Sequence, residues 1–146
     1  MDTNQCKSKH VLIVEDNSAH RKVFGFYFAK AGFRVTTAVN GRDALKVAEQ
    51  ADFDLVVTDY YMPVMSGCEF VTQLRKIPRY ARTPVILITC VLRELDADYL
   101  RNELLVFPIA KPCPIRELVA AASKCLAASS GPGSSSSQPS PVTLHP

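Results

Sequence analysis

The hydrophobic residues of the chain follow two alternating patterns. Short unbroken runs of mostly branched apolar residues occur at positions 11–14, 55–57 and 85–88. Runs of this kind are typical of strands that a parallel sheet buries on both faces. Positions 34–39 and 106–109 form two weaker strand candidates. The pattern therefore predicts five short strands.

Helical spacing fills the segments between these runs. The clearest helical stripe ends just before Gly32, which we expect to cap the helix C-terminus. That stripe comprises Val23, Phe24, Tyr27, Phe28 and Ala31. Further stripes lie within residues 44–48, 70–74, 92–99 and 115–126. A helix is thus expected after each strand.

A strand followed by a helix, five times over, predicts an α/β fold. Helices are expected on both faces of a doubly wound, five-stranded parallel sheet. The length favours the flavodoxin-like (βα)5 arrangement with strand order 2-1-3-4-5. In that order the fifth strand lies at an edge of the sheet, where the missing N–H of Pro108 need not interrupt a ladder.

The composition changes abruptly near the C-terminus. Residues 129–146 contain seven serines, four prolines and two glycines, and no Asp, Glu, Lys or Arg. Such a segment cannot bury enough apolar surface to offset its ordering entropy, so we expect a disordered tail. The folded domain is expected to span residues 8–128. This leaves no room for an attached output module, and we expect a stand-alone domain.

Composition and charge narrow the class of protein. The chain has 146 residues, of which 47% are hydrophobic and 21% charged, as in a soluble globular domain. No apolar stretch approaches the roughly 18 to 20 residues that span a bilayer, and no signal peptide is recognisable, so we expect a cytoplasmic protein with no membrane partner. The net charge is only +3 and the 17 basic residues are dispersed, so no nucleic-acid partner is expected.

The five cysteines are odd in number, widely scattered and without a CxxC pair. We expect them to be reduced thiols rather than metal ligands or disulfides.

Polar residues follow four of the predicted strands. Glu15 and Asp16 follow the first strand, Asp59 ends the third, Thr89 ends the fourth, and Lys111 comes shortly after the fifth. Open α/β sheets bind ligands at the carboxyl ends of their strands. Because these four strands are neighbours in the predicted order, the three carboxylates, the hydroxyl and the ammonium group should converge at one edge.

This set of groups indicates phosphoryl chemistry supported by a metal ion. Three close carboxylates repel one another unless a cation lies among them. Oxygen ligands without His or Cys suit Mg²⁺. One carboxylate could then attack phosphorus, while Lys111 and Thr89 contact phosphate oxygens. Taken singly, each residue also has an ordinary structural interpretation as a solvated loop acid, a turn residue, a strand end or a surface lysine.

The residues of this edge resemble a known family. Positions 56–67 read VVTDYYMPVMSG and match the D-x-x-M-P-x-M-x-G pattern of the receiver domain of two-component response regulators. Positions 11–17, Asn40-Gly41, Ile88-Thr89 and Lys111-Pro112 match in order and spacing as well. The resemblance covers residues 8–128 and is closest to single-domain, chemotaxis-regulator-like receivers.

The resemblance implies a role for each residue of the site. Asp59 would accept a phosphoryl group, and Asp16, Asp59 and the main-chain carbonyl of Tyr61 would ligate Mg²⁺, with Glu15 acting through metal-bound water. Thr89 would move toward the phosphoryl group. Lys111 would hold a phosphate oxygen.

The family also implies the partners. A sensor histidine kinase or a histidine phosphotransfer protein would donate the phosphoryl group, and a downstream protein would bind the face formed by the fourth helix, fifth strand and fifth helix. The protein would be a monomer or weak homodimer. It would not be an enzyme, apart from its own phosphotransfer and dephosphorylation.

The chain departs from the family pattern in three places. Pro108 occupies the position, three before the lysine, where receivers usually carry an aromatic switch residue, and Phe107 precedes it. Residues 99–106 lack the usual Gly-Ala pair, so the fourth helix could be longer or differently docked. Tyr61 is bulky and Val91 apolar at positions that tune hydrolysis in the family, which suggests slow self-dephosphorylation.

Three other interpretations stay open at the level of sequence. A degenerate receiver would act as a phosphorylation-independent adaptor. An aspartyl-nucleophile phosphohydrolase of the haloacid-dehalogenase type would need a second Asp where this chain has Tyr61. A flavodoxin would need a hydroxyl- and glycine-rich phosphate loop after the first strand, which is missing here.

Overall fold

A computed structural model describes residues 8–129. The strands among these residues form one five-stranded sheet. All strand pairs are parallel, and the strand order is β2-β1-β3-β4-β5. The strands are β1 (His10–Val14), β2 (Arg34–Ala38), β3 (Leu55–Asp59), β4 (Val85–Thr89) and β5 (Val106–Ala110). The predicted fold class and strand order are confirmed.

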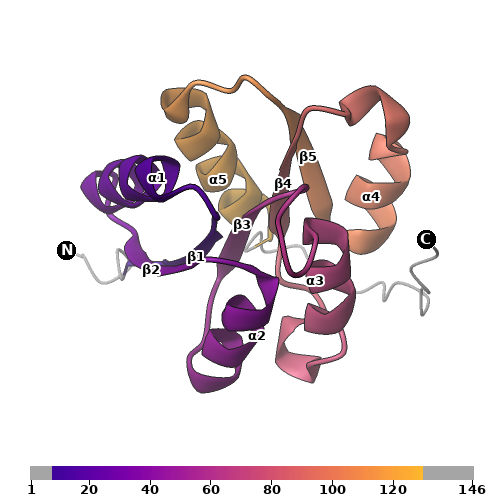
Figure 1. The fold of residues 1–146 in the computed structure, drawn as a ribbon, viewed down its shortest axis with the longest axis horizontal. Coiled ribbons are helices and arrows are strands. Elements are labelled where there is room, and N and C mark those ends of the chain that lie inside the picture. The colour runs from indigo at the N-terminus through magenta and orange to yellow at the C-terminus, as the bar shows by residue number, and fades with distance from the viewer. Residues whose placement is uncertain (1–7, 130–146) are drawn as a thin grey trace.

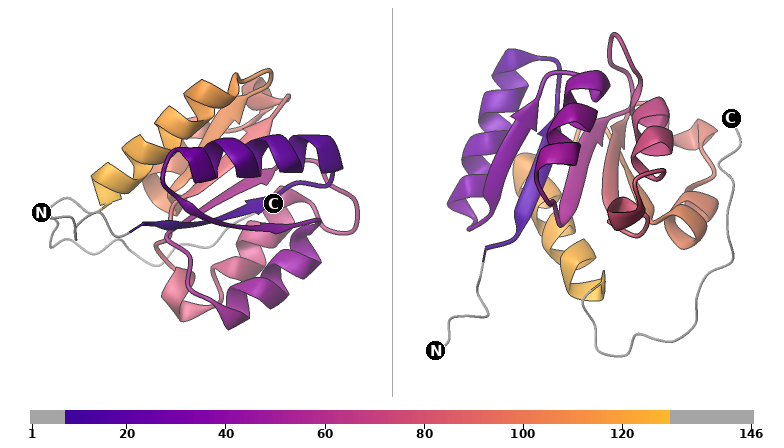
Figure 2. Two further views of the ribbon diagram at one scale, coloured as in Figure 1. Left: turned by 90° about the vertical axis from the view of Figure 1, so that its left-hand side faces the viewer. Right: turned by 90° about the horizontal axis from the view of Figure 1, so that it is seen from below.

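Within residues 8–129, four α-helices and two 3₁₀ turns connect the strands, and a fifth α-helix follows β5. The helices are α1 (Ser18–Lys30), α2 (Gly41–Gln50), α3 (Gly67–Leu74), α4 (Ala97–Leu104) and α5 (Ile115–Ser129). The 3₁₀ turns are η2 (Pro78–Tyr80) and η3 (Leu92–Glu94). Helices α1 and α5 cover one face of the sheet, and α2, α3 and α4 cover the other (Figure 1; the left view of Figure 2 shows the layers from the side).

The sheet separates two hydrophobic cores. Side chains alternate along a strand, so Val11 and Ile13 of β1 pack with α1 and α5, whereas Leu12 and Val14 pack with α2 and α3. All four side chains are buried. This burial on both faces is the reason for the unbroken apolar runs in the sequence.

The first helix buries less of its apolar stripe than the spacing predicts. Phe28 is fully buried, but Val23 and Tyr27 are 44% and 41% exposed. The stripe therefore faces partly outward, beside α5.

The fourth helix begins later than the 92–99 stripe suggested. Leu92 belongs to η3, and Asp96 caps α4 by accepting a hydrogen bond from the N–H of Tyr99 at 3.0 Å. Helix α4 ends at Leu104, before Leu105 in the left-handed conformation (φ 57°). The capping aspartate thus divides the predicted stripe between η3 and α4.

The fifth strand lies at the edge of the sheet, as predicted. Pro108 is buried opposite Leu87 of β4, on the α4 side of the sheet. Phe107 packs on the other side, with α5. Phe107 therefore cannot take the place of the aromatic switch residue that Pro108 replaces, because Phe107 lies on the opposite side of the sheet.

The predicted tail lies outside the described residues, except that α5 continues through Ser129. Within residues 8–129, no helix combines the length and the apolarity needed to cross a membrane.

Tyr80 and Arg75, which the sequence did not single out, link the segments that cover the α2–α3–α4 face of the sheet. The hydroxyl of Tyr80, in η2, donates to the main-chain carbonyls of Ala48 and Ala51 at the end of α2. The buried guanidinium of Arg75 donates to the carbonyls of Tyr80, Thr83 and Leu104 at 2.6–2.7 Å. Burial lowers the pKa of Arg75 to about 10, which still leaves it charged at neutral pH.

Candidate functional site

The ends of β1 and β3 bring three carboxylates together. Val14 pairs with Thr58, so Glu15 and Asp59 follow at the same level of the sheet. An oxygen from each of Glu15, Asp16 and Asp59 lies within 4.8 Å of the other two. Glu15 and Asp59 are only 2% and 3% exposed, whereas Asp16 faces solvent. The predicted convergence of the acidic residues is thus present.

Lys111 faces this cluster from the segment after β5. Its Nζ lies 3.2 Å from Oδ1 of Asp59, and its main-chain N–H donates to the carbonyl of Thr89 at 2.8 Å. Oδ1 of Asp59 is buried and accepts no hydrogen bond from the described residues, the ion pair with Lys111 being its polar contact. A buried carboxylate oxygen that accepts no hydrogen bond retains lone pairs that can bind a cation or attack an electrophile.

Burial changes the acidity of Glu15. Desolvation, reinforced by the hydrogen bond and charge of Asp59, raises the pKa of Glu15 to about 7, although the main-chain N–H of Asn17 opposes the shift. The ring of His20 lies 3.9 Å from the same carboxylate. Near neutral pH the cluster therefore binds a proton that a metal ion could displace.

Thr89 lies at the buried end of β4, but its hydroxyl is engaged elsewhere. Its Oγ1 accepts a hydrogen bond from the main-chain N–H of Val91 at 2.9 Å. Val91 leads directly into η3. The structure therefore places Thr89 beside Lys111 through the main chain, with the hydroxyl bonded toward η3.

The loop after β3 carries Tyr61. The Tyr61 side chain is 62% exposed and its ring packs edge-on against Tyr60, with 4.8 Å between ring centroids. Further along the loop, Val64 has a positive φ of 74°, which is costly for a β-branched residue. The loop then returns to the sheet, because the N–H of Gly67 donates to the carbonyl of Tyr60 at 2.8 Å.

Gly67 is the point of closest approach in this loop. A Cβ added there would lie 2.2 Å from the main-chain oxygen of Asp59 and 2.9 Å from Leu87 Cδ1. Only glycine allows α3 to begin against the end of β3. A capping box, formed by Ser66 and Glu69, fixes the start of the helix.

Arg21 is a further residue of the site that sequence reasoning missed. Its Nη1 donates to the main-chain oxygens of Glu15 at 2.9 Å and Asp16 at 3.4 Å, and so holds the acidic turn against α1. Asn17 caps α1 by accepting from the N–H of His20. Nothing in the sequence marks Arg21, because its partners are main-chain carbonyls.

The donor set fits Mg²⁺. It consists of carboxylates without thiolate or imidazole ligands, it concentrates negative charge, and it includes the buried, hydrogen-bond-free Oδ1 of Asp59. Hard oxygen ligands of this kind suit a small divalent cation.

A cavity of about 640 Å³ adjoins the cluster. Its polar lining residues are Glu15, His20, Asp59 and Lys111, and its apolar lining includes Val23 of α1 and Leu118 of α5. The Asp59 carboxylate is thus reachable from a cavity lined partly by the outward-facing stripe of α1.

Comparison with known families settles the relationship. Residues 11–123 match the family model described as "Response regulator receiver domain". The chain belongs to the response regulator receiver domain family. The resemblance inferred from the motifs is therefore confirmed.

Solved structures agree with this assignment. The chemotaxis response regulator CheY4 of Vibrio cholerae superposes with a TM-score of 0.73 at 29% identity, covering 82% of this receiver domain chain and 100% of that one. A CheY-like receiver from Methanospirillum hungatei gives a TM-score of 0.76 at 22% identity, over 85% and 98% of the two chains, and shows the shared fold.

Curated relatives match about half of the whole chain. The two-component response regulator ORR5 of Oryza sativa is 32% identical over 81 residues, which are 55% of this chain and 60% of that protein. The probable transcriptional regulator ycf29 of Porphyra purpurea is 37% identical over 82 residues, which are 56% and 39% of the two proteins. The chain thus spans less than two thirds of these relatives.

We expect Gly67→Ala to destabilise the receiver by about 2–3 kcal/mol, because the new methyl group overlaps main-chain atoms of Asp59. Urea unfolding measures the change. Gly25→Ala, inside α1, is the matched control. Its Cβ would lie 3.9 Å from Val35 Cγ1, in ordinary contact, so we expect it to stabilise by up to about 1 kcal/mol. Equal effects of the two substitutions would contradict the close approach at Gly67.

The raised pKa of Glu15 predicts a pH-dependent stability in the metal-free protein. The folded state binds a proton up to about pH 7, whereas the ordinary value is 4.5, so stability should fall as pH rises through this window and stay low above it. Glu15→Gln removes this loss. In EDTA we expect the variant to gain on the order of 1–3 kcal/mol over the native chain between pH 5 and pH 8.

Urea titrations at the two pH values measure this difference. Glu49→Gln, on the exposed surface of α2, is the control and should leave the pH profile unchanged. A gap between the Glu15→Gln and native proteins that is the same at pH 5 and pH 8 would show that Glu15 is not held protonated.

Proposed function

We propose that this receiver domain accepts a phosphoryl group on Asp59 from a phosphohistidine and signals by contact with another protein. The donor is a sensor histidine kinase or a histidine phosphotransfer protein. The observation that carries the proposal is the condition of Asp59, which is buried, free of hydrogen bonds at Oδ1 and 3.2 Å from Lys111. A buried carboxylate oxygen that faces an ammonium group and accepts no hydrogen bond from the described residues is available for a new bond.

In the transfer step, a carboxylate oxygen of Asp59 attacks the phosphorus atom. The new P–O bond gives an aspartyl phosphate, and the P–N bond to the donor imidazole breaks with the electron pair remaining on nitrogen. Lys111 stays beside the phosphoryl oxygens as a compensating charge.

Asp16, Asp59 and the main-chain carbonyl of Tyr61 would hold Mg²⁺, with Glu15 acting through a metal-bound water. When bound, the ion supplies the positive charge that offsets both the carboxylates and the phosphoryl oxygens. Since the Glu15 carboxyl binds a proton near neutral pH without metal, its deprotonation accompanies metal binding.

The donor approaches over α1. The 640 Å³ cavity beside Asp59 includes Val23 and Phe24 among its lining residues, and Val23 is largely exposed. A histidine on a partner helix that packs against this apolar surface would reach the Asp59 carboxylate through this cavity.

The signal passes through Thr89. Its hydroxyl bonds to the N–H of Val91, so a shift toward a phosphoryl oxygen would release that N–H and alter η3, which precedes α4. The phosphoryl group stabilises one of two conformations in this way.

The downstream partner binds at the face formed by α4, β5 and α5. Pro108 and Phe107 provide no aromatic group on the α4 side of β5, so η3 carries the coupling.

A phosphorylation-independent adaptor is the second candidate, and Pro108 at the switch position favours it. The complete acidic cluster and Lys111 favour the phospho-accepting role. The protein is proposed to act in the cytoplasm as a monomer or weak homodimer, without turnover of small phosphate esters.

Incubation with Mg²⁺ and acetyl phosphate tests the proposed function. We expect the native chain to gain the mass of one phosphoryl group, and neither Asp59→Asn nor the native chain in EDTA to gain it. Asp52→Asn, which alters an exposed aspartate paired with Arg79, is the matched control and should be phosphorylated normally. Intact-protein mass spectrometry gives the result.

The failures of this experiment have separate meanings. Absence of a mass gain in the native chain would support the adaptor. Continuous release of phosphate with rapid turnover would support an enzyme.

Tyr61 is predicted to slow self-dephosphorylation by restricting the approach of water to the aspartyl phosphate. We expect Tyr61→Ala to shorten the phosphoryl lifetime by roughly 3- to 10-fold, equivalent to about 1 kcal/mol of barrier. Tyr61→Phe keeps the ring against Tyr60 and should retain the native lifetime. Decay is followed by mass spectrometry after removal of acetyl phosphate, and an unchanged or longer lifetime in Tyr61→Ala would disprove the effect.

A further inference from the structure

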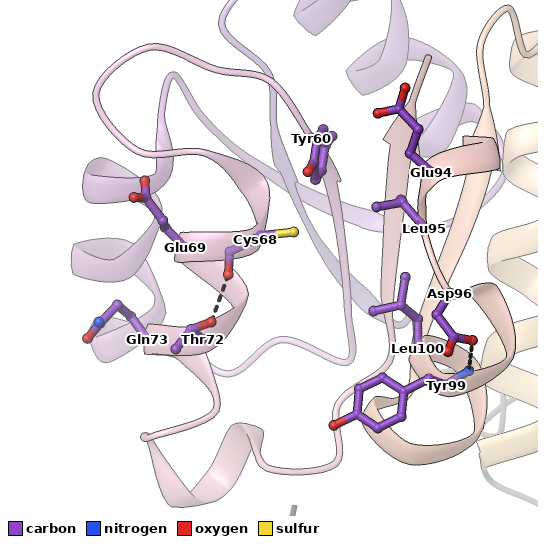
Figure 3. A pocket seen from close by; sticks show the side chains of 10 residues that line it. All are labelled: Tyr60, Cys68, Glu69, Thr72, Gln73, Glu94, Leu95, Asp96, Tyr99 and Leu100. Carbon is purple, nitrogen blue, oxygen red and sulfur yellow. Dashed lines mark hydrogen bonds between the residues drawn. The ribbon is translucent and has the colours of Figure 1, made fainter. Parts of the chain in front are cut away.

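A groove of about 700 Å³ lies between α3 and α4, away from the acidic cluster. Figure 3 shows Cys68 and Thr72 on its α3 wall, Leu95 and Leu100 on the opposite wall, and Tyr60 at its upper end. Its volume falls within the range of roughly 300–1,000 Å³ typical of protein ligand sites. The groove is therefore large enough for several side chains of a partner.

The interior of this groove is predominantly apolar. The Thr72 hydroxyl donates to the main-chain oxygen of Cys68 at 2.9 Å, so its polar atom is already satisfied within α3 (Figure 3). Burial raises the pKa of the Cys68 thiol and keeps it neutral. Leu95 and Leu100 pack partly against the core and partly line the groove. An apolar side chain would find few unsatisfied polar atoms there.

The rim of the groove is acidic. Glu69, Glu94 and Asp96 are exposed lining residues, and the lining contains no Lys, Arg or His, although the whole chain carries a net charge of +3. The carboxylate of Glu69 is held by the N–H of Ser66 at 2.9 Å, and that of Asp96 by the N–H of Tyr99. Two of the three charges are thus fixed in place by helix capping.

The third charge, on Glu94, lies near the upper end of the groove. Burial is the main reason that the pKa of Tyr60 is raised, and the nearby Glu94 carboxylate adds to the shift. Within residues 8–129, the acidic group whose oxygens converge on one point is Glu15, Asp16 and Asp59, not the rim of this groove. The rim charges are spread out and suit several cationic side chains rather than one metal ion.

We propose that the α3–α4 groove binds a short, basic amphipathic segment of a partner protein. Apolar side chains of the segment enter between Tyr60 and Leu100, and its Lys or Arg side chains pair with the rim carboxylates. This is the helix-in-groove mode of peptide recognition, with the charges setting orientation. Residues 130–146 contain no Lys or Arg, so this segment does not carry the charge that would complement the rim.

The groove is connected to the phosphorylation site on both sides. Tyr60 directly follows Asp59, and Glu94 belongs to η3, whose entry is held by the bond between Val91 N–H and the Thr89 hydroxyl. Regulation of the groove by phosphorylation rests on the proposed function. Binding by the unphosphorylated protein does not.

A labelled peptide of about 14 residues, with Leu at helical 3–4 spacing and Lys elsewhere, is the probe. Fluorescence anisotropy measures its affinity for the unphosphorylated full chain, and amide chemical shifts locate it. We expect shifts at Tyr60, Thr72 and Leu100, and a loss of affinity of about 10-fold or more in Glu94→Lys. A peptide with Glu in place of Lys should bind at least 10-fold more weakly.

Asp98→Lys is the matched control. It makes the same charge change on α4, next to Arg101 and outside the groove lining, and should keep the affinity within about 2-fold. Leu100→Ala tests the apolar part and should also weaken binding, with circular dichroism confirming the fold.

Equal losses in Glu94→Lys and Asp98→Lys, shifts centred on another face, or no binding would overturn the groove proposal. The Asp59 mass-gain experiment uses neither peptide nor groove variants. The two proposals can therefore fail separately.

Discussion

Repulsion between carboxylates at the ends of two adjacent strands is the constraint on which the rest of this structure depends. The parallel register of β1 and β3 brings Glu15 and Asp59 to one level, where both are buried. Neither charge is easily tolerated there without compensation. Lys111 partly offsets Asp59, and the raised pKa of Glu15 allows a proton to offset the other. The site therefore combines two buried carboxylates that require compensating positive charge with a third carboxylate, Asp16, that is exposed.

The surrounding architecture keeps these groups close while leaving Asp59 Oδ1 without a hydrogen bond. Arg21 holds the main chain of the acidic turn, and Gly67 lets α3 begin against the end of β3. Both residues act through main-chain atoms, so the carboxylates themselves stay available. Lys111 is likewise positioned through its main chain. Its N–H donates to β4, while its ammonium group lies beside Asp59.

The sheet and the position of the site could be predicted from the sequence, because burial on both faces leaves continuous apolar runs and polar residues directly follow them. The roles of Asp59, Thr89 and Lys111 stay predictions. The fourth helix was not predictable from its stripe, since Asp96 turns the chain within it. Tyr80 and Arg75 left no sequence signal either, because their partners are main-chain carbonyls that every residue possesses. Such contacts depend on tertiary geometry alone.

The Arg75 contacts give α4 two unequal ends. The guanidinium binds the carbonyl of Leu104 at 2.7 Å together with carbonyls near η2, so the C-terminal end of α4 is anchored to α3. The N-terminal end continues into η3 and depends on the Thr89–Val91 hydrogen bond. Helix α4 is thus held by an arginine side chain at its C-terminal end, whereas its N-terminal end adjoins η3 and the Thr89–Val91 hydrogen bond.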